Sequence, residues 1–354
     1  MSDQTNIEWA DSTFNPWMGC AKVSPACDHC YAERDTKRFG RVEWGAGKPR
    51  VRTSAANWKL PERWNKAEFV RCENCGHRAD GKPWFDATEA GGVSSDGIAC
   101  AKCGSRDTEP VSRRVFCASL ADWLDNEVPI EWLVDLLDLI RRTPNLDWLL
   151  LTKRIGNWRA RLDAAYHCAR PDKKEPESDV AKWIGNWLCT VPPANVWLGS
   201  TMIDRPEMLR DAEKLARVPA AVLFWSVEPM LGDFGVIPKH LMPNWIIAGG
   251  ESGPHARPMH PDWIRSLRDQ CAAAGVAFLL KQWGEWLPFD MSDDESWYAK
   301  HRYSLPLRWW DGERWRDAEG EMRDDALWVA RCGKKSAGRK LDGIEHDGFP
   351  AAQP

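Results

Sequence analysis

The sequence has no apolar run that approaches the roughly 20 residues a transmembrane helix needs. Its first residues, MSDQTNIEWADS, lack a basic region followed by an apolar segment, so no signal peptide is predicted. Basic charge is not in excess either. The formal net charge is −4 and the pI is about 6.1, which argues against a globally basic nucleic-acid-binding chain but leaves a local basic groove open. We expect a cytoplasmic protein with no membrane partner.

Tyrosine is scarce, with 4 residues, and phenylalanine contributes 10, whereas tryptophan contributes 23. Indole rings can stack on nucleobases, but they also fill hydrophobic cores, and we expect core positions for most of them. The 354 residues, 43% of them hydrophobic, suit one large α/β domain with insertions or two domains. We divide the chain into four parts. They are an N-terminal region at 1–60, which we expect to bind a metal cluster through its three cysteines, a four-cysteine insertion at 61–112, a main domain at 113–290 and a Trp-rich extension at 291–354.

From residue 113 onward, short apolar runs alternate with amphipathic segments such as PIEWLVDLLDLIRRT, RPEMLRDAEKLARV and HPDWIRSLRDQCAAAG. The last of these begins with a proline–aspartate pair and stops at Gly275, as a helix does. Continuous apolar strands between helices indicate a parallel sheet buried on both faces. We therefore predict a partial β/α barrel, with a doubly wound open sheet as the alternative. The expected strands are residues 114–118, 148–151, 196–199, 222–225, 245–248 and 277–280, with a possible first strand at 15–19.

Polar residues follow most of these strands, where the carboxyl ends of β/α-barrel strands build active sites. Helix capping explains any one of them, since Ser, Thr and Asp are favoured caps, but it explains the whole series less well. We therefore expect a shared site formed by Asp122, Thr152, Lys153, Arg154, Ser200, Thr201, Ser226, Glu228, Gly249, Gly250, Glu251, Ser252, Lys281 and Gln282.

Three cysteines lie close together in the loop NPWMGCAKVSPACDHCY, with six residues between Cys20 and Cys27 and two between Cys27 and Cys30. Three thiolates can hold three irons of a [4Fe–4S] cluster and leave the fourth iron open for S-adenosylmethionine (SAM). A zinc site with His29 as its fourth ligand is the alternative. We favour the cluster, because His29 lies between two close cysteines and is badly placed to reach the same ion.

A second cysteine group consists of two CxxC pairs, ENCGH and AKCGS, separated by 24 residues. Paired CxxC knuckles typically form a tetrahedral four-thiolate zinc site, and a glycine follows each pair where a tight turn needs one. We expect a closed, structural zinc site that folds an otherwise polar insertion, with a second iron–sulfur cluster as the alternative. The ligands would be Cys72, Cys75, Cys100 and Cys103.

Several longer motifs make a family resemblance specific. The segments NIEWADSTFNPWMGCAKVSPACDHCYAE, SAANWKLPERWN, LLLTKR, VWLGSTM, SVEPMLG, GGESGPHARPMHPDW and FLLKQWGEW resemble those of the phage gene-product 37/68 family of three-cysteine-motif proteins, regarded as radical-SAM-like. The resemblance implies the incomplete barrel of SAM radical enzymes, with Cys20, Cys27 and Cys30 as cluster ligands. Two features depart from the common pattern: the spacing is six then two instead of three then two, and His29 stands where an aromatic residue is usual.

The resemblance also suggests a SAM site, since GGE at 249–251 is similar to the glycine-rich motif that holds the SAM amine, although it follows a late strand here. The expected SAM-binding residues are Ser200, Glu228, Gly249, Gly250, Glu251 and Ser252. The catalytic candidates are Lys153, Glu228 and Lys281.

Three functions compete at this point. The first is a radical SAM enzyme that acts on a modified nucleobase or nucleotide in phage DNA and receives electrons from a reductant protein. The second is a non-catalytic, zinc-bearing nucleic-acid-binding protein. The third, a hydrolase using Asp122, Glu228 and Glu251, ranks last because no spacing in the sequence marks a two-metal site.

Overall fold

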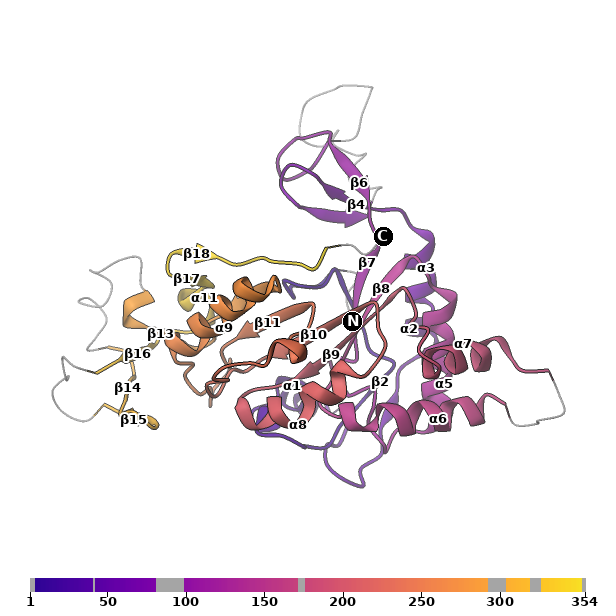
Figure 1. Cartoon of the computed structure of the whole chain (residues 1–354), viewed down its shortest axis with the longest axis horizontal. Coiled ribbons are helices and arrows are strands. Elements are labelled where there is room, and N and C mark those ends of the chain that lie inside the picture. The colour runs from indigo at the N-terminus through magenta and orange to yellow at the C-terminus, as the bar shows by residue number, and fades with distance from the viewer. Residues whose placement is uncertain are drawn as a thin grey trace.

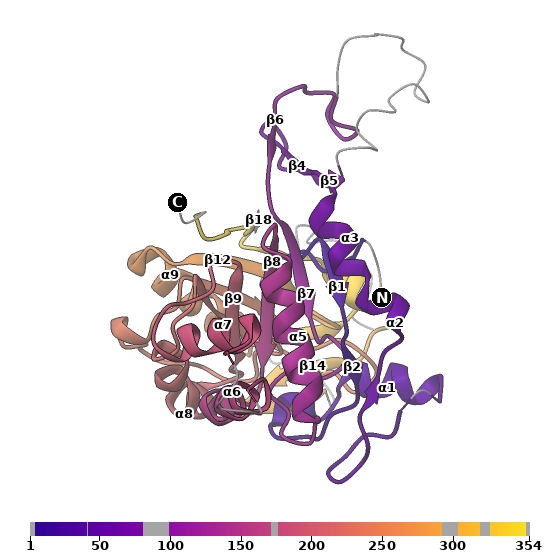
Figure 2. The ribbon, with the colours of Figure 1, turned by 90° about the vertical axis from the view of Figure 1, so that its right-hand side faces the viewer.

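The computed structural model describes residues 4–40, 42–80, 99–170, 176–291, 304–318 and 326–351. Its centre is a seven-stranded parallel sheet, curled into a half-barrel, in which the strands follow one another in chain order (Figures 1 and 2). The strand order does not reverse anywhere along the sheet. A doubly wound open sheet has such a reversal, at its topological switch point, and that alternative is therefore excluded. The strands are β1 (Ser12–Phe14), β7 (Arg113–Cys117), β8 (Leu146–Thr152), β9 (Val196–Thr201), β10 (Val222–Val227), β11 (Trp245–Gly249) and β12 (Ala277–Gln282).

The prediction of an α/β fold with a partial β/α barrel is thus confirmed, and the predicted helices lie between the strands. Helix α9 begins at Pro261 and ends at Ala274, where Gly275 adopts the left-handed conformation with φ 69°. Burial of Leu133, Leu137 and Ile140 follows the predicted helical period. The helices between strands are α5 (Ile130–Arg142), α6 (Trp158–Cys168), α7 (Asp179–Leu188), α8 (Arg205–Ala216) and α9 (Pro261–Ala274), with short 3₁₀ turns at Ile155–Asn157 and Lys239–Leu241.

The first strand lies three residues earlier than predicted. Pro16 has no N–H to donate to a ladder, so β1 ends at Phe14 and the chain turns. The following residues form β2 (Trp17–Met18), which pairs antiparallel with β3 (Val51–Arg52). Between these strands lie a 3₁₀ turn at Pro25–Cys27 and helix α1 (Tyr31–Arg38), and after β3 come α2 (Ala55–Trp58) and α3 (Leu60–Lys66).

The half-barrel has a separate core on each face of its sheet. The outer core joins the sheet to the helices, while the inner core includes Phe116, Phe224 and Trp245 and is completed by Trp9 from the N-terminal segment. Both cores contain several tryptophans, in agreement with the expectation that most of them fill core positions. Among the largest fully buried side chains are Trp9, Trp17, Trp123, Trp148, Trp187, Trp225, Trp245 and Trp283.

The C-terminal extension is joined closely to the barrel. Its antiparallel sheet begins inside the predicted main domain, with β13 (Trp286–Pro288), and the chain then returns to the half-barrel. There Gly348 N donates to Phe278 O at 2.9 Å, and Phe349 packs against the inner core. The other elements are β14 (Leu307–Trp310), β15 (Trp315–Asp317), β16 (Trp328–Arg331), α11 (Lys334–Ala337), β17 (Lys340–Leu341), β18 (Ile344–Glu345) and a 3₁₀ turn at Phe289–Met291.

The four-cysteine insertion forms a small antiparallel sheet of β4 (Phe69–Cys72), β5 (Arg78–Asp80) and β6 (Thr108–Pro110). This module projects from the half-barrel at the end where β7 begins (Figures 1 and 2). Residues 81–98 of the insertion lie outside the described residues. Within the described part of the chain, no helix is both long and apolar enough to cross a membrane.

Candidate functional site

A cavity of about 450 Å³ opens at the carboxyl ends of the strands. The loop that carries Cys20, Cys27 and Cys30 forms one wall, and the start of α1 continues it. Most of the polar residues predicted to share a site also line this cavity, although they come from strands far apart in the sequence. These are Asp122, Thr152, Lys153, Arg154, Ser226, Glu228, Gly250, Glu251, Ser252, Lys281 and Gln282.

Strand alternation explains why Lys153, Glu228 and Lys281 point to the same side. Leu149, Phe224 and Leu279 pack in the inner core, and side chains two or four residues further along each strand share that face. Lys153 and Lys281 therefore extend from the inner face just past its apolar layer. The sheet thus changes from an apolar filling to a polar rim at its carboxyl edge.

Three predicted residues, Ser200, Thr201 and Gly249, do not line the cavity. Thr201, the last residue of β9, is buried. Ser200 shares its strand face with Val196 and Leu198, which pack in the outer core, and it is fully buried. Gly249 lies behind the wall: a Cβ there would stand 3.2 Å from both Glu228 Oε1 and Gln282 O. Gly249 thus leaves room for the Glu228 carboxylate instead of facing the cavity.

Arg154 links the end of β8 to the cysteine loop. Its Nη1 donates to Cys20 Sγ at 3.2 Å and to Asp122 Oδ2 at 3.1 Å, and its Nη2 donates to Ala21 O at 2.7 Å. Burial raises the pKa of the Cys20 thiol to about 12; the nearby Asp122 also raises it, and Arg154 lowers it. An ionised sulfur at this position therefore needs a cation beside it.

Glu251 holds the other end of the same loop through Arg257. Arg257 Nε donates to Glu251 Oε2 at 2.8 Å, while its other nitrogens reach Pro25 O at 3.0 Å and Asp28 Oδ2 at 3.2 Å. His29 Nδ1 lies 3.1 Å from the same Glu251 oxygen. Although burial opposes the shift, hydrogen bonds from Arg257 and His29 hold the pKa of Glu251 below its usual value. The Glu251 carboxylate is therefore ionised and hydrogen-bonded to Arg257 and His29.

The C-terminal residues that hold the segment of Glu251 and Arg257 in place were not identified from the sequence. Glu285 Oε1 accepts from Gly253 N at 3.0 Å, and Trp286 Nε1 donates to Ala256 O at 2.7 Å. Arg331 Nη2 donates to the carbonyls of residues 253 and 254, at 3.0 and 2.6 Å. The motif GGESGPHARP was visible in the sequence, but nothing there shows partners that lie up to 78 residues away.

The remaining charged groups of the strand ends differ in how they are paired. Lys281 Nζ lies 3.1 Å from Glu228 Oε1, so these two neutralise each other across the β11 edge. Lys153 donates its backbone N–H to Asp122 Oδ2 at 2.9 Å, but its ammonium has no ion-pair partner among the described residues. Lys153 is therefore the cavity-lining cation best placed to meet an anion.

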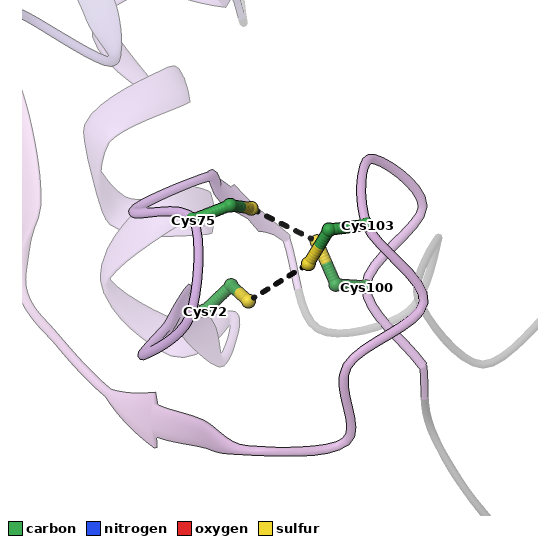
Figure 3. A group of neighbouring side chains, drawn as sticks. All are labelled: Cys72, Cys75, Cys100 and Cys103. Atoms are coloured by element: carbon green, nitrogen blue, oxygen red, sulfur yellow. Dashed lines mark hydrogen bonds between the residues drawn. The ribbon is translucent and has the colours of Figure 1, made fainter.

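The second cysteine group is compact. The donor atoms of Cys72, Cys75, Cys100 and Cys103 all lie within 4.8 Å of one another. Figure 3 shows the four sulfurs converging from two loops, with 3.6 Å between the sulfurs of Cys72 and Cys103 and 3.6 Å between those of Cys75 and Cys100. Zn–S bonds of about 2.3 Å in a tetrahedron place sulfurs roughly 3.8 Å apart, so the group can hold a metal ion.

The two CxxC loops repeat the same backbone geometry. Gly76 N donates to Cys72 O at 2.9 Å, and Gly104 N donates to Cys100 O at 2.7 Å. Both glycines take the left-handed conformation, with φ 69° at Gly76 and 73° at Gly104. The glycine that follows each pair is therefore needed for the turn, as predicted.

Partly buried ionic contacts anchor this module to the sheet. Arg78 Nη2 lies 3.0 Å from Asp11 Oδ2 and donates to Ser112 O at 2.7 Å, and Arg113 pairs with Asp80. These contacts lie where β1 and β7 begin, whereas the cavity lies where the strands end. No residue of the described part of the module lines the cavity.

The fold and the cavity define a half-barrel α/β protein with a cysteine-lined site at its strand ends. The chain belongs to the family described as proteins of unknown function, DUF5131, whose model matches residues 4–350. No curated protein and no solved structure matches the chain.

Proposed function

We propose that the protein is a radical SAM enzyme whose [4Fe–4S] cluster is held by Cys20, Cys27 and Cys30. The observation that carries this proposal is the meeting of all three thiols with the polar strand ends around one cavity. A cavity of about 450 Å³ suits a small-molecule cofactor, and three thiolates leave one iron free to bind it.

The donor set fits a cluster better than a single ion. Among the described residues, the four-cysteine group is the one set of three or more ligand atoms that all lie within 4.8 Å of one another. At least two sulfurs of the triad Cys20, Cys27 and Cys30 are therefore more than 4.8 Å apart. A tetrahedral zinc ion needs closer sulfurs. Moreover, His29 Nδ1 already lies 3.1 Å from Glu251, which argues against His29 as the fourth zinc ligand.

A cluster held by Cys20, Cys27 and Cys30 would supply the one-electron reduction of SAM from which radical hydrogen abstraction starts. The protein's part is to hold and orient. Lys153, with its unpaired ammonium, suits the SAM carboxylate or a substrate phosphate, and Glu228 and Ser252 suit the amine or hydroxyls. Glu251 is engaged by Arg257, so we assign it to positioning the cysteine loop instead of binding SAM.

For the substrate we propose a nucleobase or nucleotide. The aromatic side chains that line the cavity include the half-buried Trp44 and the exposed Tyr31, and planar bases bind well on aromatic surfaces. Lys153 and the Lys281–Glu228 pair supply polar contacts in the same cavity and remain the catalytic candidates. The four-cysteine module borders another end of the barrel, so we propose for it a structural Zn²⁺ and no part in catalysis.

The test is anaerobic purification followed by iron, sulfide and zinc analysis, an absorption spectrum, and incubation with dithionite and SAM. The proposal predicts about four irons and one zinc per chain, absorption near ~400 nm, and release of 5′-deoxyadenosine. A colourless protein with about two zincs after iron–sulfur reconstitution would refute it and favour a zinc-stabilised nucleic-acid-binding protein, whose affinity for DNA would fall with added salt.

A further inference from the structure

The Arg154 guanidinium lies in a fixed, buried position beside one sulfur of the triad. The side chains of Arg154 and Asp122 are only 7% and 6% exposed. Its guanidinium donates to three acceptors: Cys20 Sγ, Asp122 Oδ2 and Ala21 O. Because arginine stays protonated in proteins, the Cys20 sulfur faces a permanent positive charge.

Asp122 keeps this guanidinium in place because its own carboxylate is fully engaged. Its Oδ1 accepts from Thr152 Oγ1 at 2.7 Å and from Leu124 N at 3.0 Å. Its Oδ2 accepts from Lys153 N at 2.9 Å. The carboxylate therefore ties the loop after β7 to the end of β8, and the N–H of Arg154 is aimed before any cluster is bound.

The contact is specific to one cysteine. In the described part of the chain, no side-chain donor reaches the sulfurs of Cys27 or Cys30, whereas Cys20 receives Arg154 at 3.2 Å. A cluster bound by the three thiolates would thus carry one charge-assisted N–H···S contact at a defined corner. Hydrogen bonds to the sulfurs, local charge and burial are the protein's means of tuning the potential of an iron–sulfur cluster.

We propose that Arg154 is a positioning residue that raises the reduction potential of the cluster through the Cys20 sulfur, and that Asp122 opposes it. This inference rests on the proposed function, since it requires a cluster on the triad. Reduction adds one negative charge to the cluster, so a fixed cation and an N–H donor favour the reduced form. The Asp122 carboxylate acts in the opposite direction and limits the effect.

The experiment is an EPR-monitored redox titration of the reconstituted full-length protein, together with iron analysis of each variant. Arg154→Gln removes the charge, Arg154→Lys keeps the charge but loses the planar fork, and Asp122→Asn removes the opposing charge. Arg159→Gln is the matched control, because Arg159 lies on α6 and pairs with Asp163 in an exposed contact.

We expect a more negative midpoint potential for Arg154→Gln, a smaller shift in the same direction for Arg154→Lys, a more positive potential for Asp122→Asn, and no change for Arg159→Gln. Equal potentials in variants that all carry about four irons would overturn the inference and leave the proposed function standing. A wild-type protein without a cluster would instead refute the proposed function. If Arg154→Gln binds no iron, the Asp122→Asn titration decides: a positive shift supports the inference, and an unchanged or negative shift overturns it.

Discussion

Arg257 and Glu251 form a bidentate pair, with Nη2 2.6 Å from Oε1 and Nε 2.8 Å from Oε2. Arg257 also reaches Pro25 O, within the cysteine loop, while the C-terminal sheet holds the backbone just before it, at residues 253, 254 and 256. The C-terminal extension therefore supports the triad indirectly: its sheet fixes residues 251–257, and these fix the loop between Cys20 and Cys30.

This relationship predicts that Arg257→Gln weakens metal retention without removing a ligand. Outer contacts of metal ligands typically contribute about 10–100-fold to metal affinity or activity, and we expect a loss in that range for iron bound at the triad. Iron per chain after gel filtration at a series of chelator concentrations measures it. Arg265→Gln, which breaks exposed contacts to Asp342 and Asp290, is the control. Equal iron loss from both variants would contradict a specific role for Arg257.

Replacing one triad cysteine should remove the iron but leave the fold. We expect Cys27→Ala to lose enzymatic activity and nearly all of its roughly four irons, since a cluster held by two thiolates is unstable, while its circular dichroism matches the wild type. Cys189→Ala, at an exposed and isolated cysteine, should keep both iron and activity. Wild-type activity in Cys27→Ala would rule out a cluster on the triad.

The four-cysteine module offers an independent test through its turns. A side chain at Gly76, where φ is 69°, costs about 1 kcal/mol, which corresponds to roughly a fivefold loss of metal affinity if the turn must form to bind. We expect Gly76→Ala to show this loss in competition with a chromophoric chelator. Gly156→Ala, whose nearest side-chain atom would be 3.8 Å away, should bind zinc normally.

Direct loss of a ligand should have a larger effect on the same module. We expect Cys75→Ala to lose about one zinc per chain and to lower the solubility of the protein, because the module would no longer fold. The triad iron should stay bound, since no described residue of the module lines the cavity. A stable Cys75→Ala protein with full zinc content would contradict the structural role.

The sequence predicted best those features that depend on neighbours along the chain. The end of α9 at Gly275, the turns at Gly76 and Gly104, and the alternation that brings Lys153 to the cavity all follow from local rules. Contacts across the fold could not be predicted in this way. Arg257 meets a loop about 230 residues away, and Phe349 completes a core begun near residue 9, because the curled sheet brings them together.

One further prediction concerns the amino ends of the strands. Burial raises the pKa of Asp147 to about 6, and the nearby cations Arg114 and Arg78 offset only part of this. A carboxyl with a raised pKa in the folded state lowers stability as the pH rises from about 4, where it ionises when unfolded, through about 6. Above that range its cost is constant.

Asp147→Asn should therefore increase the free energy of unfolding by up to about 2 to 3 kcal/mol at pH 8, and by only about 1 kcal/mol at pH 4.5, where the folded carboxyl is still protonated. Urea unfolding of the holoprotein at both pH values measures the difference. Asp163→Asn, at a side chain that is 44% exposed and pairs with Arg159, should change stability by less than about 0.5 kcal/mol at either pH. An equal effect of Asp147→Asn at pH 4.5 and pH 8 would show that packing, and not the burial of a charge, governs this position.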